Sequence, residues 1–333
     1  MGYTLCILGC GTMGVAITSG VTASLETRAK HPYLVDGSSP KSGTSTPSLD
    51  SIHGAPDAAL PSRFIACVSR HESAKKLKRT FQDLGPMGQN VEVLVDENLQ
   101  AVKESNVVLL CCKPQAAYAI LSAPGLKEAL DQKLLISILA GVTISQLEDW
   151  VLPTTRVVRA MPNTPCRIRE GMTVVSTVPY EQTLDREIIS TIFSSIGRCR
   201  FLDEKHFDAC TALSGSGPAF VCLVLEAMAD GGVMMGLPRV EALELAAQTL
   251  QGTARMALQT GVHPAQIKDS VTTPAGCTIA GLLTLEDGRV RSTIARAIQV
   301  ATQHAAALGQ PNKADDARQK RLPSGYQTPR VVD

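Results

Sequence analysis

The sequence is poor in aromatic residues, which make up 4% of its 333 residues although 44% are hydrophobic. Its core must therefore be mainly aliphatic. Basic and acidic residues nearly balance, at 32 against 31, so the chain lacks the concentrated positive charge that grips a phosphate backbone. Few rings also leave little surface for stacking bases. These shortages argue against a nucleic-acid partner and favour a protein that handles a small molecule, and the length predicts two domains.

Metal and membrane signatures are missing as well. The ten cysteines include no CxxC pair and no histidines at zinc-ligand spacing, so we expect no metal site. Several of these cysteines lie in apolar runs, which indicates reduced thiols. No run approaches the roughly 18 uninterrupted apolar residues of a membrane span, and the first 25 residues lack the basic start of a signal peptide. We expect a cytoplasmic protein with no membrane partner.

The beginning of the chain carries a glycine-rich turn between a predicted strand and a predicted helix. The pattern GxGxxG, at Gly9, Gly11 and Gly14, directly follows an apolar run of strand length. In a dinucleotide-binding fold these glycines permit a tight turn, close approach of the pyrophosphate, and close helix–strand packing. The N–H groups of Gly11, Thr12 and Met13 are then expected to face the phosphates. The alternative is a glycine-rich turn that holds no ligand.

The second strand sets the choice of cofactor, and two segments compete for that place. His31–Asp36 ends in an acid about 20 residues past the glycines, which suits the ribose of NAD, but its apolar run is short. Residues 63–70 form a stronger strand that ends in Ser69 and Arg70, a hydroxyl beside a guanidinium that suits a 2′-phosphate. Residues 31–62 are then a low-complexity insert. We predict NADPH, with NADH as the alternative; the competing interpretation makes Arg70 a solvated strand-end charge.

Strands and helices then alternate as in a doubly wound parallel sheet. The pattern predicts helices over 72–84, 99–104 and 116–130 and strands over 91–95, 107–112 and 133–139. Ligands bind at the carboxyl ends of such strands. At these ends we expect the cofactor to meet Cys112, Lys113, Pro114, Ala140 and Gly141. Asn98 either caps a helix or reaches the adenosine.

The second half of the chain is predicted to be mainly helical. We assign residues 1–178 to a dinucleotide-binding domain, 179–309 to a helical domain and 310–333 to a disordered tail. Asn163, in a proline-flanked turn, either bonds its own backbone or faces the ligand. The segment 213–220 interrupts the helical pattern with serines and glycines. The Ala- and Gly-rich helix after it predicts close helix–helix contact and subunits joined through helices.

A loop of small residues joins two predicted helices at 270–278, which read Ser-Val-Thr-Thr-Pro-Ala-Gly-Cys-Thr. Unpaired N–H groups at residues 275–278 and the hydroxyls of Thr272, Thr273 and Thr278 would form a cradle for a carboxylate. The competing interpretation is an elaborate helix cap.

Taken together, these motifs resemble the pyrroline-5-carboxylate reductase family. The resemblance rests on the glycine turn, on Lys113-Pro114, and on the segments 140–144, 161–165, 213–219, 229–233 and 268–278. It implies a Rossmann-like domain followed by an all-α dimerisation domain, in a homodimer that is often assembled further. It also implies NAD(P)H-dependent reduction of the cyclic imine 1-pyrroline-5-carboxylate to L-proline.

The resemblance assigns roles to single residues. Thr278 is placed beside the ring nitrogen as the catalytic residue, Asn163 lies on the nicotinamide side, and Ser69, Arg70 and Asn98 reach the adenosine and its phosphate. The loop around the substrate carboxylate comprises Thr272, Thr273, Ala275, Gly276, Cys277 and Thr278. No titratable side chain in this loop is an obvious general acid, so catalysis is expected mainly from positioning.

The sequence departs from the family in three places. Phe220 stands where many members carry Tyr. Ala275 replaces a common Gly, which is tolerable only if its φ stays negative. The insert 31–62 is expected to loop out near the adenosine end.

Two other functions stay open. A dehydrogenase of small β-hydroxyacids would share the first half, but it would need a catalytic Lys after the domain junction, and residues 205–230 contain only Lys205. A non-enzymatic NADP-binding redox sensor would have no need of the threonine-rich loop.

Overall fold

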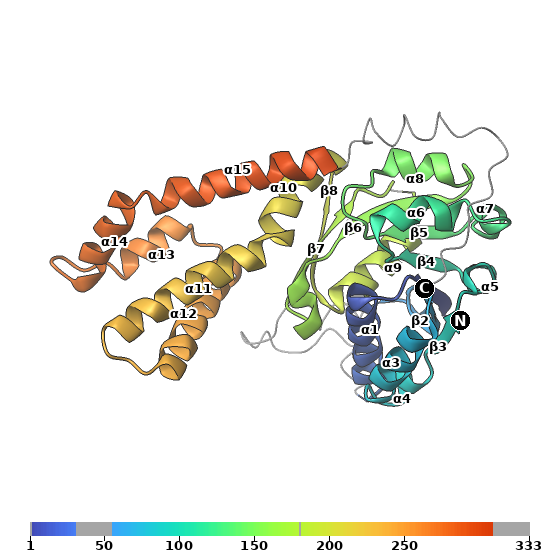
Figure 1. The fold of residues 1–333 in the computed structure, drawn as a ribbon, viewed down its shortest axis with the longest axis horizontal. Coiled ribbons are helices and arrows are strands. Elements are labelled where there is room, and N and C mark those ends of the chain that lie inside the picture. The colour runs from blue at the N-terminus through green and yellow to red at the C-terminus, as the bar shows by residue number, and fades with distance from the viewer. Residues whose placement is uncertain (1, 31–54, 180, 309–333) are drawn as a thin grey trace, which may run out of the picture.

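The computed structural model describes residues 2–30, 55–179 and 181–308. The candidate strand His31–Asp36, most of the predicted insert and the tail 310–333 lie outside these residues. Figure 1 shows a compact α/β part from which a long helical arm extends to one side.

The α/β part is built on one eight-stranded sheet with the order β3-β2-β1-β4-β5-β6-β7-β8. Its strands are β1 (Tyr3–Leu8), β2 (Pro61–Val68), β3 (Glu92–Val95), β4 (Val107–Leu110), β5 (Leu134–Ser137), β6 (Arg156–Met161), β7 (Gly171–Ser176) and β8 (Gly197–Leu202). The first six strands are parallel. Strand β1 pairs with β2 on one side and with β4 on the other, so the strand order reverses between β1 and β4. This reversal is the switch point at which doubly wound sheets bind ligands.

The sheet is covered on both faces, which explains why its central strands β1, β4 and β5 are mainly apolar. Alternate residues of β1 point to opposite cores: Leu5 and Ile7 to one, Cys6 and Leu8 to the other. The first core is closed by α1 (Thr12–Lys30), α3 (His71–Gln82) and α9 (Thr183–Ser194). The second is closed by α5 (Asn98–Lys103), α6 (Pro114–Leu121), α7 (Leu126–Ala129) and α8 (Ile144–Trp150).

Several predicted elements differ from those observed. The single helix expected over 116–130 is two helices, α6 and α7, because the chain turns at Pro124 and at Gly125, whose φ is 79°. An additional strand, β7, runs antiparallel to β6, so the predicted all-parallel sheet is reversed once. The predicted insert is also too long, because Asp57–Ala59 form a short 3-10 helix (η2) and Pro61 and Ser62 belong to β2.

The helical arm begins at residue 204. Its elements are η4 (Glu204–His206), α10 (Phe207–Cys210), the π-helical turn η5 (Thr211–Gly215), α11 (Gly217–Met234), α12 (Arg239–Thr260), α13 (Pro264–Ser270), α14 (Cys277–Asp287) and α15 (Val290–Leu308). The predicted interruption at 213–220 is therefore a π-helical turn inside a continuous helical path, with Ser216 N–H donating to Thr211 O at 2.9 Å. Helix α15 runs back along the arm to α10, beside the sheet (Figure 1).

The arm buries little of its apolar surface within one chain. Small residues let α11 and α12 pack closely: Ala229, Ala242 and Ala246 are buried, and a Cβ on Gly232 would lie 3.3 Å from that of Ala242. Large side chains around them remain exposed, including Leu223 at 67%. The stretch Glu204–Met234 contains an 18-residue window with a mean hydropathy of 1.5, and so has the length and composition of a membrane-crossing helix. Length and composition do not distinguish a lipid-facing helix from one that packs against another subunit.

Candidate active site

The glycine turn between β1 and α1 is held by close backbone contacts. Gly9 has a φ of 75°, and a Cβ there would lie 2.7 Å from Cα of Cys112, at the end of β4. A Cβ on Gly14 would lie 3.0 Å from Cγ2 of Ile7 in β1. Gly9 therefore requires glycine for its backbone conformation, and glycine at position 14 allows the close approach of helix and strand. This is the division of roles that the GxGxxG pattern predicts.

Gly11 differs, because its surroundings are open. A Cβ on Gly11 would meet only the carbonyl oxygen of Gly9, at 3.9 Å. Its N–H donates to that same oxygen at 2.7 Å, so the expectation that this N–H faces the phosphates is wrong for this structure. The donors that point out of the turn are those of Thr12, Met13 and Gly14, in the first turn of α1, where a helix offers no acceptor.

A cavity of about 450 Å³ opens beside the glycine turn. Gly11 and Thr12 line it together with the cationic side chains of Lys76 and Arg167. No acidic residue is among the residues that line it, so the charge around the turn suits an anionic ligand. The free helical N–H groups and this cavity fit the phosphates of a dinucleotide.

The carboxyl end of β2 presents a hydroxyl and a guanidinium. Ser69 and Arg70 follow β2 directly, and both are exposed. Asn98 lies one strand further along the sheet, as the first residue of α5. Glu97 holds the N-cap position there, and no side chain caps this helix, so the interpretation of Asn98 as a cap is wrong.

The expected contacts on the other side of the switch point follow β4 and β5. Cys112 packs its backbone against Gly9, Lys113 is exposed at the N-cap of α6, and Pro114 begins that helix. After β5, Ala140 is exposed and Gly141 has a φ of 75°. All of these residues lie at the same edge of the sheet as the glycine turn.

Asn163 fastens two segments of backbone together. Its Oδ1 accepts a hydrogen bond from the N–H of Met172, at 2.8 Å, and its Nδ2 donates to the carbonyl oxygen of Ser214, at 3.1 Å. The first bond holds the turn after β6 against β7, and the second reaches the π-helical turn of the arm. Asn163 therefore joins the sheet to the arm instead of bonding the backbone of its own turn.

The threonine-rich loop lies between α13 and α14. Gly276 is the N-cap of α14, and Cys277 and Thr278 are its first two residues. The N–H of Gly276 donates to the carbonyl oxygen of Thr273 at 3.0 Å, so it is paired, contrary to our expectation. The N–H groups of Cys277 and Thr278 are first-turn donors, which a helix leaves without an internal acceptor.

Ala275 in this loop has a φ of +57°, and the expectation of a negative φ is wrong. The left-handed conformation costs a non-glycine residue about 1–2 kcal/mol, so this loop keeps a shape that its sequence disfavours. Its neighbours Thr273 and Cys277 are exposed, and Thr272 and Thr278 are half-buried.

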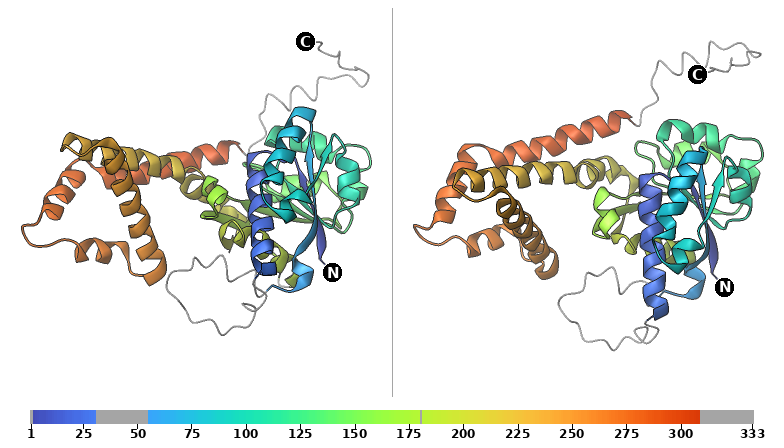
Figure 2. Two further views of the ribbon diagram at one scale, coloured as in Figure 1. Left: turned by 90° about the horizontal axis from the view of Figure 1, so that it is seen from below. Right: turned by 60° about the horizontal axis from the view of Figure 1, so that its bottom comes forward.

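The two halves of the predicted site do not meet within one chain. Figures 1 and 2 place α13 and α14 at the outer end of the arm, far from the glycine turn and from the ends of β4 and β5. The cofactor-side residues are gathered at the sheet edge, whereas the residues expected to hold the carboxylate lie on the arm, where they are exposed or half-buried.

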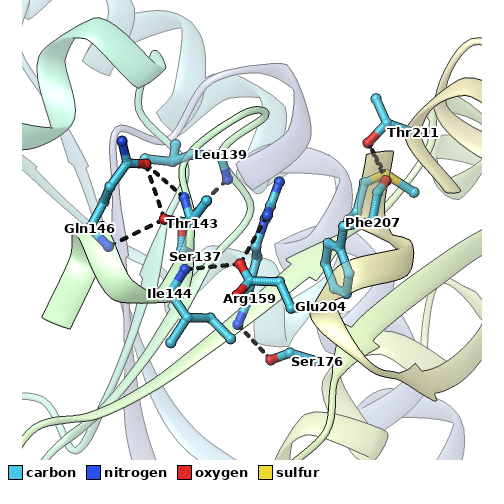
Figure 3. Close-up of polar contacts among 11 residues, drawn as sticks. Ser137, Leu139, Thr143, Ile144, Gln146, Arg159, Ser176, Glu204, Phe207 and Thr211 are labelled. Carbon is cyan, nitrogen blue, oxygen red and sulfur yellow. Dashed lines mark hydrogen bonds and ion pairs between the residues drawn. The ribbon is translucent and has the colours of Figure 1, made fainter. Parts of the chain in front are cut away.

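The structure adds residues that the sequence did not single out. At the junction of sheet and arm, Arg159 of β6 forms an ion pair with Glu204, which also accepts a hydrogen bond from the N–H of Ile144 (Figure 3). The available signal was a charged residue inside the otherwise apolar strand Arg156–Met161. Among the described residues, no three His, Cys, Asp or Glu side chains gather as metal ligands.

The chain is similar to known proteins along most of its length. It is 46% identical over 306 residues to a pyrroline-5-carboxylate reductase of Schizosaccharomyces pombe, covering 91% of this chain and 98% of that protein. A pyrroline-5-carboxylate reductase of Lophium arboricola is 45% identical over 317 residues, covering 92% and 93%. Residues 204–308 match the family described as "Pyrroline-5-carboxylate reductase dimerisation", and residues 52–141 match "NADP oxidoreductase coenzyme F420-dependent".

Solved structures of similar fold have related names. The Plasmodium falciparum pyrroline carboxylate reductase with NADP bound has a TM-score of 0.69 at 26% identity, covering 92% of this chain and 98% of that one. A pyrroline-5-carboxylate reductase from Coxiella burnetii has a TM-score of 0.70 at 27% identity, covering 93% and 99%.

Proposed function

Because the chain belongs to the pyrroline-5-carboxylate reductase family, we propose that it reduces 1-pyrroline-5-carboxylate to L-proline with NADPH. The observation that carries the proposal is the open cavity beside the glycine turn, which is lined by cationic side chains. It occurs in a chain that matches a pyrroline-5-carboxylate reductase over nearly that protein's whole length. The threonine-rich loop supplies hydroxyl and backbone donors for a carboxylate, which a redox sensor does not require. Residues 205–230 contain only Lys205, whereas a β-hydroxyacid dehydrogenase would need a catalytic Lys in this stretch.

The protein's contribution to the reaction is mainly to bind and orient. When bound, the reduced nicotinamide supplies a hydride to the imine carbon, and the imine nitrogen takes one proton from water. The loop from Thr272 to Thr278 holds the carboxylate, and the hydroxyl of Thr278 bonds the ring nitrogen. Placing donor and acceptor in contact in this way lowers the barrier without a titratable side chain in the loop.

NADPH is the cofactor we favour over NADH. Ser69 and Arg70 stand exposed at the carboxyl end of β2, the strand beside β1 in the sheet. In doubly wound folds this place contacts the 2′ position of the adenosine ribose. A guanidinium and a hydroxyl suit a 2′-phosphate, since both donate hydrogen bonds to it. Asn98 lies one strand further out, where it reaches the adenosine.

A homodimer completes the site in this proposal. The carboxylate loop and the cofactor edge are far apart in one chain, and the arm exposes large apolar side chains such as Leu223 and Met228. Residues 204–308, which make up the arm, are also those that match the dimerisation family. A second copy covers the apolar surface and brings its loop to the cofactor edge of the first.

We also propose that the protein works in the cytoplasm. All ten cysteines are free, and five of them lie at β1, the glycine turn, β2 and the end of β4, namely Cys6, Cys10, Cys67, Cys111 and Cys112. So many free thiols suit a reducing compartment.

The reaction is tested by following NADPH oxidation with purified protein, with and without 1-pyrroline-5-carboxylate. We expect oxidation only with the substrate, and L-proline as the product by mass spectrometry. NADPH oxidation with the oxidised, carbonyl form of a small β-hydroxyacid instead indicates the dehydrogenase. Tight NADPH binding with no substrate-dependent oxidation indicates the sensor. Either result rejects the proposal.

The role of Thr278 is tested by Thr278→Ala. We expect kcat/KM for the imine to fall by about 10²-fold, because a contact made in the transition state is lost, with NADPH binding unchanged. Thr284→Ala is the matched control, since Thr284 is an exposed threonine two turns along the same helix. Wild-type turnover in Thr278→Ala would show that this hydroxyl has no role.

A further inference from the structure

The root of the helical arm is fastened to the sheet by a largely buried ion pair (Figure 3). Arg159 lies in β6 with its side chain only 6% exposed, and its Nη1 donates to Oε1 of Glu204 at 2.9 Å. The guanidinium also lies 4.8 Å from the centre of the Phe207 ring, in α10. The backbone N–H of Arg159 donates to Oγ of Ser176 in β7, at 3.0 Å. Arg159 is thus fixed at both its backbone and its side chain.

The same oxygen of Glu204 also holds the loop that follows β5. Oε1 accepts a second hydrogen bond from the N–H of Ile144, at 2.9 Å. Ile144 begins α8 and is preceded by Thr143, whose side chain forms a capping box with Gln146. Glu204 therefore fixes the far end of the loop that carries Gly141, which lies at the cofactor edge.

The ion pair forms part of the wall of a cavity at this edge. Gly141, Thr143, Arg159 and Glu204 line it, and its volume is about 350 Å³. The carboxylate of Glu204 therefore joins the sheet, the loop at the cofactor edge and the arm, and it lines a cavity that small molecules can enter.

Glu204 is also the first residue of the continuous helical path that carries the arm, Glu204–Met234. A helix of this length spans about 45 Å at 1.5 Å per residue, so a rotation of about 5° at its root moves the far end by about 4 Å. Misplacement of reacting groups by about 1 Å can lower a rate by about 10²-fold. The orientation of the arm at its root therefore matters for any reaction that needs both the arm and the sheet edge.

A charged pair suits this role better than an apolar contact. An apolar pair of similar volume often stabilises a fold as well or better, because burying charge is costly. A carboxylate with two donors in fixed directions instead selects one geometry, since any other leaves the buried guanidinium unpaired. Oε1 of Glu204, which accepts hydrogen bonds from both Arg159 and Ile144, is such an acceptor.

We propose that Glu204 is a positioning residue for hydride transfer. Through Arg159 and Ile144 it holds the loop at Ala140 and Gly141 and the root of the arm in one relative orientation, without touching cofactor or substrate. The inference rests on the proposed function, because it requires that hydride pass between a cofactor at the sheet edge and a substrate held by the arm.

The test compares Glu204→Ala and Glu204→Asp with wild type. It measures kcat, the Kd for NADPH, and the primary isotope effect with NADPH deuterated at the transferred position. In both variants we expect kcat to fall, by about tenfold or more in Glu204→Ala, with Kd within about twofold. The isotope effect should rise, because hydride transfer becomes more rate-limiting. The shorter Asp cannot reach both donors, so its loss is also expected.

Glu204→Gln is the conservative rescue, since its amide oxygen can still accept from both Arg159 and Ile144. We expect it to recover most of kcat. Asp203→Asn is the matched control, because it removes an exposed ion pair with Lys205 at the adjacent residue, and its kinetics should equal those of wild type.

A merely structural role would lower kcat only in proportion to the fraction of chains that bind NADPH, with the isotope effect unchanged. That result, or wild-type kcat in Glu204→Asp, overturns the inference. If Glu204→Ala does not fold, Glu204→Asp and Glu204→Gln decide, and equal rates in these two reject it. Absence of substrate-dependent oxidation in the wild type rejects the proposed function instead, so the two failures are distinguishable.

Discussion

At the scale of single residues, the three glycines of the first turn have different physical reasons to be there. Gly9 has a left-handed backbone and no space for a Cβ, and Gly14 packs against Ile7. Gly11 satisfies neither condition, because a Cβ there would find open space. The absence of a side chain at Gly11 is therefore explained by a ligand that approaches the backbone, not by the protein's own packing.

A comparison of Gly9→Ala with Gly11→Ala separates the packing reason from the ligand-binding reason. Gly9→Ala should lower the free energy of unfolding by about 2 kcal/mol or more, because it adds left-handed strain and a clash with Cys112. Gly11→Ala should leave the melting temperature near that of wild type and weaken NADPH binding strongly. Calorimetric titration and thermal melts measure both. Unchanged NADPH affinity in a folded Gly11→Ala would contradict a cofactor at this turn.

The cysteines near the turn are expected to react slowly. Burial raises the pKa of Cys10 to about 12 and that of Cys112 to about 11. The thiolate is the reactive form, so at pH 7.5 Cys112 should carry roughly 100-fold less of it than an ordinary thiol. Its alkylation by iodoacetamide, followed by mass spectrometry, should be slow at pH 7.5 and rise about tenfold per pH unit until the pH nears 11.

The control for this prediction is the same protein unfolded in urea, in which Cys112 should react as an ordinary thiol. Bound NADPH should slow the reaction of Cys112 at high pH further. Fast modification of Cys112 at pH 7.5 would show that its surroundings are wetter or more cationic than the structure has them.

At the scale of elements, the π-helical turn η5 is the contact through which the arm meets the turn after β6. Thr211 donates from Oγ1 to the carbonyl oxygen of Phe207 at 2.8 Å, and Asn163 donates to the carbonyl oxygen of Ser214. Such turns inside α-helices are frequent at functional sites. Here the widened turn presents the Ser214 carbonyl to Asn163.

Asn163→Asp tests this contact. The substitution keeps the acceptor for Met172 N–H but turns an oxygen toward the Ser214 carbonyl, where a donor is needed. We expect a loss of about 1–3 kcal/mol in the free energy of unfolding, measured by urea denaturation. Ser214→Ala removes only the 3.3 Å contact to Oγ and should cost less. Equal stability of Asn163→Asp and wild type would mean that the turn and the arm are not joined through this amide.

The sequence predicts the elements that depend on local signals. Strands β1, β4 and β5 are short, mainly apolar runs, and α1 follows a glycine pattern, so these elements are visible without tertiary information. The break between α6 and α7 was missed because the apolar spacing continues across Pro124 and Gly125. Strand β7 was missed although it is as long as β1, because it pairs antiparallel to β6 and this pairing depends on tertiary contacts. The ion pair of Arg159 with Glu204 joins residues far apart in sequence, which no local pattern contains.

The candidate site was likewise predictable only where its residues belong to a local sequence pattern. The glycine turn, the ends of β2, β4 and β5, and the threonine-rich loop were each found from their residue types. The φ of Ala275 and the pairing of the Gly11 and Gly276 N–H groups depend on the path of the folded backbone, so the sequence does not report them.

At the scale of the whole molecule, the separation between the arm's loop and the cofactor edge makes a specific prediction about shared sites. Gly11→Ala disables the cofactor turn of a chain, and Thr278→Ala disables its loop. If each site combines one chain's turn with the partner's loop, a mixed dimer contains one intact site. Co-expression in equal amounts gives mixed dimers in half of the population, and so about a quarter of wild-type activity.

The matching control is a mixture of the two variants purified separately and kept from exchanging subunits, which should be inactive. Activity near zero in the co-expressed sample, with mixed dimers verified by affinity tags, would show that each site is built within one chain.

The attachment of the predicted insert has a consequence for how this chain can vary. Its described flanks, the end of α1 and residues 55–59, are clasped together by Arg28, which donates to the carbonyl oxygen of Ala55 at 2.9 Å and to Asp57 at 3.2 Å. Both lie at the amino ends of the strands, opposite the glycine turn, because α1 runs back across the sheet. The attachment is therefore not at the adenosine end, as the sequence led us to expect.

Adding residues between these flanks changes the free energy of folding only slightly. Once the ends are held, doubling the length of a connecting segment costs only about 0.6 kcal/mol in closure entropy. Relatives can therefore gain or lose residues at this connection, and an engineer can insert a reporter there. The chemistry at the opposite edge of the sheet is not affected.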